Sequence, residues 1–287
     1  MRIDEEITAA TRRLEIAGLA EPRREAASLL ASVIGRSSSF LIAHPEYELA
    51  VVDQTNFEKS VYRRSQREPF QYITGRQEFW GLEFEISPGV LIPRPETEIL
   101  VEAAIEVLKD LEQPSFVEAG VGSGCISVSI LYSVPKAIAT ATDISRIAIG
   151  LAKKNASKHD VSDRLDIREA DLLSGVTGKF TLVVSNPPYI PDSDIATLQP
   201  EVRDYEPVEA LAGGSDGLEI VRRLISDSGH ILAPGGVLMM EIGAGQAAAV
   251  VDLFDPREWG PPEFRNDLQA IPRVVIARRK LSSLLTQ

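Results

Sequence analysis

The stretch Val184-Ser185-Asn186-Pro187-Pro188-Tyr189 decides the fold, because it joins an apolar strand, Phe180 to Val184, to a rigid polar turn. The two prolines lack N–H donors and have a fixed φ, so strand pairing must stop at Asn186. At the end of a strand, the Asn186 amide both accepts and donates hydrogen bonds, and the carbonyl of Pro187 adds a fixed acceptor. The turn is therefore predicted to hold a planar NH2 group; the alternative is a polar turn without a binding role.

The composition predicts a globular chain of one or two domains. Its 287 residues are 44% hydrophobic with no long apolar run, and charges interrupt the N-terminal segment, so neither a signal peptide nor a membrane span is expected. Cys125 is the only cysteine, so no disulfide is expected and the cytoplasm is the expected compartment. A net charge of −12 disfavours direct contact with nucleic acid. The three histidines are scattered, and no metal site is predicted.

Residues 1–75 are predicted to form a small helical bundle. Apolar residues recur at helical spacing from Ile3 to Leu14, and Gly18 ends that helix. A second helix is expected from Pro22 to Gly35, with further helical segments over 38–41 and 51–66. Two uses of this bundle stay open: it docks a partner, or it covers an edge of the next domain.

A β-hairpin over residues 76–93 is predicted to connect the bundle to the rest of the chain. Phe84 and Ile86 alternate with glutamates, Ser87-Pro88-Gly89 is expected to turn, and Val90–Ile92 is expected to form the return strand. Pro93-Arg94-Pro95-Glu96-Thr97-Glu98 follows, and Thr97 is expected to cap the next helix. This segment is either a helix entry or a loop that closes over a ligand.

Residues 94–287 alternate strands with helices, which predicts a parallel sheet covered on both faces. Strands are expected near 115–119, 137–142, 165–170, 180–185, 237–242 and 274–277. The first leads into Gly120-Val121-Gly122-Ser123-Gly124, and a helix begins at Cys125. Such a turn brings the backbone close to a ligand. Because Cys125 stands where a dinucleotide fingerprint has its third glycine, NAD is the poorer candidate.

Polar side chains follow the next strands. Asp143 ends the second strand, where it can take both hydroxyls of a ribose, and Asp171 with Leu172 follows the third, where the pair can flank an adenine. Helix capping is the alternative for both acids. Together with Asn186, these residues are expected at the carboxyl edge of the sheet, where open α/β sheets bind ligands.

The sequence resembles the S-adenosylmethionine-dependent methyltransferases, and within them the protein glutamine N5-methyltransferases that act on peptide chain release factors. The Asn-Pro-Pro-Tyr turn is shared with adenine and guanine N-methyltransferases, whereas the Pro-Arg-Pro-Glu-Thr-Glu segment is more specific to the glutamine enzymes. The motifs that carry the resemblance span nearly the whole chain: Gln71–Gly75, Leu91–Glu98, Asn186–Ile190, Glu206-Pro207 with Ala210-Leu211, Gly213–Leu218, Pro234–Gly236 and Glu241–Gly243.

The resemblance implies a seven-stranded, mostly parallel Rossmann-like sheet with the last strand antiparallel, preceded by a substrate-docking domain. It implies methyl transfer from S-adenosylmethionine to the glutamine of a Gly-Gly-Gln loop in a release factor, by a chain expected to be a monomer. The implied catalytic residues are Asn186, Pro187 and Tyr189, and Pro188 joins them in binding the substrate. The implied cofactor-binding residues are Gly120, Val121, Gly122, Ser123, Gly124, Asp143, Asp171, Leu172 and Asn186.

Two departures from the family pattern stand out. Val121 replaces a hydroxyl side chain often found between the glycines, which puts cofactor affinity in question, and Ala270 replaces a glycine near the C-terminus. Two other functions stay open: glutamine methylation of a ribosomal protein, and methylation of an exocyclic amine in a nucleic acid, which the same clamp could hold.

Overall fold

The computed structural model describes residues 2–281 and divides into two compact units. One unit comprises the chain up to Arg76 together with Gln199–Tyr205, and the other comprises Gln77–Leu198 and the chain from Glu206 onward. Gln199–Tyr205 falls inside the predicted 94–287 domain, and its grouping with the N-terminal helices had no signal in the sequence. Within residues 2–281, no helix is both long and apolar enough to cross a membrane.

The N-terminal unit is the predicted helical bundle. Leu14, Leu30 and Phe57 are fully buried in one apolar cluster that the helices share. Gly35 ends the second helix in the left-handed region at φ 62°, as its place in the sequence predicted. The helices are α1 (Ile3–Ile16), α2 (Pro22–Ile34), α3 (Ser38–Ala43), α4 (Val51–Ser65), α5 (Phe70–Thr74) and α9 (Pro200–Arg203).

Buried charge attaches Gln199–Tyr205 to this bundle. The guanidinium of Arg64, on α4, bonds the carboxylates of both Glu25 and Glu201. Arg67 donates a second bond to Glu201, at 2.8 Å. Because Arg64 is only 6% exposed, its charge depends on these two carboxylates for compensation.

The linking hairpin exists, but its return strand was predicted at the wrong place. The hairpin loop is formed by Trp80 and Gly81. The predicted turn at Pro88 and Gly89 is present, but it does not join two strands, because Val90–Ile92 is not a strand. Trp80 and Gly81 both have positive φ, 56° and 68°, as a two-residue hairpin loop requires. A tryptophan seldom adopts this conformation, so the sequence pointed to the proline-glycine pair instead. The strands are β1 (Arg76–Phe79) and β2 (Leu82–Glu85).

The second unit is built on the predicted seven-stranded, mostly parallel Rossmann-like sheet, with strand order β5-β4-β3-β6-β7-β9-β8. The last strand, β9, runs antiparallel to β7, as the resemblance implied. β8 was not predicted individually, because its side chains are largely exposed and show no apolar alternation. The strands are β3 (Ser115–Ala119), β4 (Ile138–Asp143), β5 (Leu165–Glu169), β6 (Phe180–Ser185), β7 (Leu232–Glu241), β8 (Glu263–Asn266) and β9 (Pro272–Arg278).

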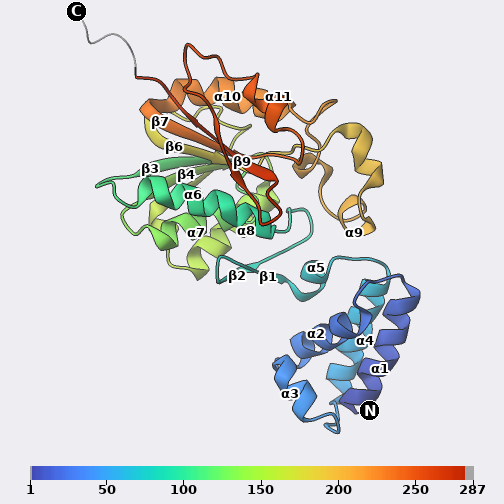
Figure 1. Ribbon diagram of the computed structural model, residues 1–287. Coiled ribbons are helices and arrows are strands. Elements are labelled where there is room, and N and C mark those ends of the chain that lie inside the picture. The colour runs from blue at the N-terminus through green and yellow to red at the C-terminus, as the bar shows by residue number, and fades with distance from the viewer. Residues whose placement is uncertain (1, 282–287) are drawn as a thin grey trace, which may run out of the picture. The chain divides into compact units, whose positions relative to one another are not determined.

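Helices cover both faces of this sheet (Figure 1). One face carries α6 (Glu98–Leu108), α7 (Cys125–Ser133) and α8 (Arg146–Lys158), and the other carries α10 (Glu219–Ile231) and α11 (Ala247–Val251). Short 3-10 turns complete the described chain: η1 (Pro95–Thr97), η2 (Ser162–Arg164), η3 (Asp192–Thr197) and η4 (Val208–Ala210).

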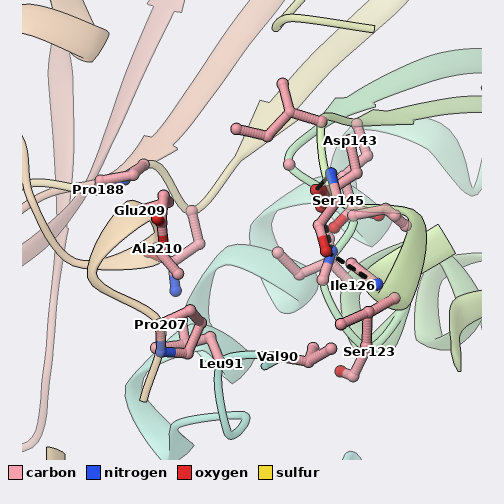
Figure 2. A pocket seen from close by; sticks show the side chains of 18 of the residues that line it. Val90, Leu91, Ser123, Ile126, Asp143, Ser145, Pro188, Pro207, Glu209 and Ala210 are labelled. Atoms are coloured by element: carbon pink, nitrogen blue, oxygen red, sulfur yellow. Dashed lines mark hydrogen bonds between the residues drawn. The ribbon is translucent and has the colours of Figure 1, made fainter. Parts of the chain in front are cut away.

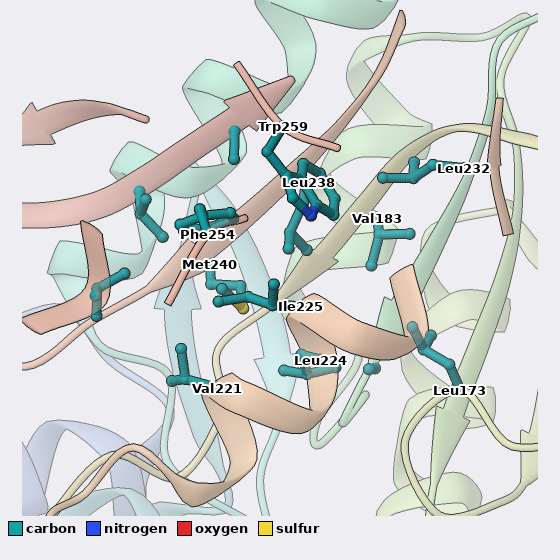
Figure 3. Packing of buried hydrophobic residues seen from close by; sticks show 14 of the residues in the cluster. Leu173, Val183, Val221, Leu224, Ile225, Leu232, Leu238, Met240, Phe254 and Trp259 are labelled. Carbon is teal, nitrogen blue, oxygen red and sulfur yellow. The ribbon is translucent and has the colours of Figure 1, made fainter. Parts of the chain in front are cut away.

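One apolar core lies under α10 and α11. Figure 3 shows Val183 and Met240 of the sheet in one cluster with Leu224 of α10. The rings of Phe254 and Trp259 in this cluster are in edge-to-face contact, with 5.5 Å between their centroids. Side chains alternate between the two faces of a strand. The residues next to this core along β3 and β7, Glu118 and Glu241, therefore point to the opposite face, on which α6 and α7 pack.

Candidate active site

A cavity of about 790 Å³ lies at the carboxyl ends of the central strands (Figure 2). Figure 2 shows Asp143 and Ser145 on one wall and Pro188 and Glu209 across from them. The volume is in the range of small-molecule and cofactor sites. Gly124, Pro187 and Tyr189 are not part of the lining. The predicted site residues that line it are Gly120, Val121, Gly122, Ser123, Asp143, Asp171, Leu172, Asn186 and Pro188.

The glycine turn after β3 is tied to β4 by backbone hydrogen bonds. The N–H groups of Gly120 and Val121 both donate to the carbonyl of Thr142, at 2.9 Å each. Val121 is buried, and the loss of a hydroxyl at this position leaves the turn intact. Gly124 has φ 84°, and a Cβ there would approach Ala152 of α8 to 3.2 Å. The turn therefore requires glycine where it packs against α8.

Asp143 holds the same turn through its side chain. Its Oδ2 accepts from the N–H of Gly122 at 2.9 Å, and its Oδ1 accepts from the N–H of Ser145 at 2.8 Å. Ser145, not Asp143, is the N-cap of α8, because its hydroxyl accepts from the N–H of Ala148. A carboxylate has about four lone-pair directions, so Asp143 keeps acceptor capacity for a ligand in the cavity.

Asp171 and Leu172 line another part of the cavity. The carboxylate of Asp171 pairs with Arg223 of α10 at 2.7 Å, and Arg223 lines the cavity as well. Leu172 has φ 48°, and its carbonyl accepts from the Thr142 hydroxyl at 2.6 Å. Thr142 thus supports both the glycine turn and the Leu172 backbone.

Glu118 is a fully buried carboxyl at the cavity that was not predicted as a site residue. One of its oxygens accepts from the N–H and the hydroxyl of Ser127. The other, Oε1, has no hydrogen-bond partner within residues 2–281. Burial raises the pKa of Glu118 to about 8, against the Ser127 bonds that lower it, and the charge of Asp143 adds to the rise.

Asn186 is held by a chain of hydrogen bonds that begins in the Pro93–Glu98 segment. Its Nδ2 donates to Oγ1 of Thr97 at 3.2 Å, and the Thr97 hydroxyl donates to Oε2 of Glu241 at 2.6 Å. The prediction that Thr97 caps the next helix is wrong, because its side chain makes no capping bond. The η1 turn directs the hydroxyl into the interior instead, toward the end of β7.

Tyr189 is held at both of its ends. Its hydroxyl donates to Oε1 of Glu241 at 3.1 Å, and its carbonyl accepts from Nε2 of Gln246 at 2.9 Å. Burial raises the pKa of Tyr189, and the charge of Glu241 adds to the rise. The backbone of Gly217 packs so closely that a Cβ there would lie 2.3 Å from the Tyr189 carbonyl oxygen.

Glu241 joins these contacts although the sequence showed it only as part of a motif. Burial raises its pKa, while the hydrogen bonds from Thr97 and Tyr189 lower it. The sequence pattern that could have identified Glu241 is its position directly after the apolar run Val237–Met240. A charged residue at the end of a buried strand is costly unless it has partners. Another buried acid, Glu206, accepts a hydrogen bond from Arg94, near the start of the Pro93–Glu98 segment that also contains Thr97.

Two family models match the chain. The model described as PrmC N-terminal domain matches residues 5–75, and the model described as Methyltransferase small domain matches residues 96–199. Between them they cover both the helical bundle and the strands that surround the cavity.

Individual relatives match over nearly the full length. A release factor glutamine methyltransferase of Koribacter versatilis is 37% identical over 98% of this chain and 100% of its own. One of Geobacter sulfurreducens is 40% identical over 91% of each chain. A solved methyltransferase structure from Pyrococcus furiosus matches with a TM-score of 0.52 and 15% identity, covering 70% of this chain and 90% of its own, which supports the fold alone.

Proposed function

This chain belongs to the release factor glutamine methyltransferase family, and from that premise we propose which of its residues carry the reaction and what they hold. The reaction moves a methyl group from S-adenosylmethionine to the side-chain amide nitrogen of a glutamine in a release factor. The target is proposed to be the glutamine of the Gly-Gly-Gln loop.

The orientation of Asn186 is the observation that carries this proposal. Its Nδ2 is engaged by Thr97, and no group within residues 2–281 bonds its Oδ1. Because Asn186 lines the cavity, Oδ1 is available to accept an N–H from a bound amide. The carbonyl of Pro187 is the second acceptor, so that the two N–H bonds of the glutamine have one partner each. Tyr189, fixed by Glu241 and Gln246, packs beside the flat amide.

The residues around the glycine turn fit S-adenosylmethionine. The unpartnered Oε1 of buried Glu118 suits a positively charged group, which the methionine part of this cofactor carries. Asp143 would take the ribose hydroxyls, and Asp171 with Leu172 would flank the adenine. When bound, the cofactor supplies an electrophilic methyl group on a sulfonium.

An amide nitrogen is a poor nucleophile, because its lone pair is delocalised into the carbonyl. Asn186 and Pro187 therefore have to orient the NH2 group and draw electron density toward its nitrogen by accepting both N–H bonds. With the cofactor bound, Asn186 and Pro187 would hold the nitrogen toward the methyl group that the sulfonium supplies, and water would take one N–H proton. Neutralisation of the sulfonium charge favours the poorly solvated walls that Val121 and Pro188 provide.

We also propose the setting in which this chain acts. The helices before Arg76 dock the release factor, because one glutamine side chain offers far less contact than the roughly 1,000 Å² that specific interfaces need. Ile42 and Val51 on these helices are 82% and 80% exposed and available for such contact. The chain is proposed to work as a monomer in the cytoplasm, without direct nucleic-acid contact, in keeping with its net charge of −12.

Incubation with radiolabelled cofactor and separate pools of release factor, ribosomes and DNA tests the proposed substrate. Label is expected in the release factor alone. Label in ribosomal protein or in DNA, with none in the factor, would contradict the proposal. The Asn186→Ala variant serves as the background control in each pool.

A further inference from the structure

The hydrogen bonds that link Glu241, Thr97 and Asn186 determine which end of the Asn186 amide faces the cavity. An ionised carboxyl has only acceptors, so while Glu241 carries its charge, both hydroxyls that contact it donate to it. Thr97 thereby uses its only hydroxyl proton on Oε2 of Glu241, at 2.6 Å. With its proton used in this bond, Oγ1 of Thr97 can only accept a hydrogen bond from another group.

The one donor on the Asn186 side chain is its NH2 group. Because Thr97 offers lone pairs, Asn186 must turn Nδ2 toward it, as observed at 3.2 Å, and Oδ1 must then face away from Thr97. With the opposite orientation, two acceptors would face each other and a buried polar contact would be lost. An Asn186 in that orientation would present N–H groups to the substrate amide instead of an acceptor.

We propose that Glu241 is the positioning residue that sets the acceptor face of Asn186 through Thr97. Glu241 does not touch the substrate. Its two oxygens fix Thr97 on one side and Tyr189 on the other, so a single buried carboxyl at the end of β7 orients two of the groups assigned to the amide. This inference rests on the proposed function, because it assigns the acceptor of Asn186 to the glutamine N–H.

The location of the three groups explains why the segment before α6 belongs to the active site. Thr97 lies at the entry to α6, Asn186 follows β6, and Glu241 ends β7. Thr97 and Glu241 are each 2% exposed, whereas Asn186 is partly exposed and lines the cavity. No water needs to mediate between them, since the hydrogen bonds are direct.

A double-mutant cycle on the full-length enzyme tests the route through Thr97. Glu241→Gln replaces one of the two acceptor oxygens by an NH2 group, which cannot accept the hydrogen bond from Thr97 or Tyr189. Thr97→Val removes the Thr97 hydroxyl and keeps the side chain nearly the same shape. Each is expected to lower kcat roughly 10- to 100-fold on the release factor, with cofactor affinity within a few-fold of wild type. The kcat of the double variant is expected to lie within about 3-fold of the kcat of the less active single variant. Multiplied losses, or a Glu241→Gln enzyme with wild-type kcat, would overturn the proposal.

Two control variants separate positioning from simple structural damage. Thr97→Ser restores the hydroxyl and is expected to bring kcat back to within a few-fold of wild type. Asp252→Asn alters an exposed acid of the same unit, outside the cavity, and is expected to leave kcat unchanged. A parallel loss of melting temperature and cofactor affinity in Glu241→Gln would reduce its role to folding and overturn the proposal.

A measurement without substrate keeps this test independent of the proposed function. In nitrogen-15 spectra, the side-chain NH2 signals of Asn186, identified by their absence in Asn186→Ala, should exchange slowly with solvent in wild type and Thr97→Ser. They should exchange faster in Glu241→Gln and Thr97→Val, which lose the fixed acceptor. Unchanged exchange in both would overturn the positioning role, whereas a wild type inactive on release factor would contradict only the proposed function.

Discussion

The Oδ2 atom of Asp143 accepts a 2.9 Å hydrogen bond from the backbone N–H of Gly122, so a carboxylate at the end of β4 holds the turn that follows β3. The same carboxylate bonds the N–H of Ser145 at the start of α8. Asp143 therefore shapes the cavity before any ligand binds, in addition to the ribose contact proposed for it.

Replacing Asp143 by alanine is expected to weaken cofactor binding by about 1–3 kcal/mol, because the charge-assisted ribose contact and the support of the turn are lost together. Titration calorimetry measures this directly. Asp143→Asn keeps one acceptor oxygen and should fall between wild type and alanine. Asp255→Ala, a change at a partly exposed aspartate outside the cavity, is the control and should leave the affinity as it is. Unchanged affinity in Asp143→Ala would remove the ribose assignment.

Gly217→Ala is expected to lower kcat by roughly 10-fold or more, because its Cβ would lie 2.3 Å from the carbonyl oxygen of Tyr189 and displace that residue. Gly175→Ala is the matched control. The two glycines have φ of 73° and 72°, so the backbone strain is alike, but a Cβ at Gly175 meets nothing within 4 Å. Steady-state kinetics should separate them, and equal losses of kcat would show that strain alone is responsible.

Cofactor affinity is expected to fall as the pH decreases from about 8, the pKa to which burial raises Glu118. Below that pH the free enzyme carries a proton on Glu118, and a cationic ligand group favours the carboxylate, so binding must release this proton. Calorimetry at pH 7 in buffers of different ionisation enthalpy counts the released protons. Glu118→Gln should abolish the release at this site. The same proton release in both proteins would argue against Glu118 as the partner of the cationic group.

Arg64→Ala is expected to destabilise the N-terminal unit by about 3–5 kcal/mol, because Glu25 and Glu201 would lose the cation between them. Although burial raises the pKa of Glu201, hydrogen bonds from Arg67 and Arg64 lower it below its ordinary value. Its contribution to stability is therefore present above its unfolded pKa and is lost as the pH falls through the lower folded value. Thermal melts at neutral and acid pH measure both effects.

The same variant tests the docking role. Cofactor binding resides in the other unit and should persist in Arg64→Ala, while methylation of intact release factor should fall more than methylation of a short Gly-Gly-Gln peptide. Equal losses on factor and peptide would contradict docking by the N-terminal helices.

The sequence predicted the cavity because its main residues follow the ends of parallel strands. Asp143 ends one strand and Asn186 directly follows another, and parallel strands bring their carboxyl ends to one edge. The number of strands and the antiparallel last strand came from the family resemblance, since β8 carries no apolar pattern of its own, and the strand order was not predicted.

Contacts between distant positions could not be predicted in this way. Thr97 and Glu241 are 144 residues apart, and no local pattern shows that one bonds the other. Thr97 was assigned to a helix cap because threonine before an amphipathic helix usually has that role. The turn at Trp80 was not predicted, because tryptophan seldom has positive φ. The contacts that stabilise this conformation, including the hydrogen bond from its N–H to Glu98, are tertiary and leave no local pattern in the sequence.

Mass-spectrometric localisation of the methyl group on a release factor tests the central claim most directly. Wild-type enzyme is expected to add the mass of one methyl group to the Gly-Gly-Gln peptide, with fragment ions that place it on the glutamine side-chain amide. Asn186→Ala should bind cofactor within a few-fold of wild type and reach the same product roughly 100-fold more slowly. A methyl group on any other residue, or an Asn186→Ala enzyme as fast as wild type, would contradict the amide clamp.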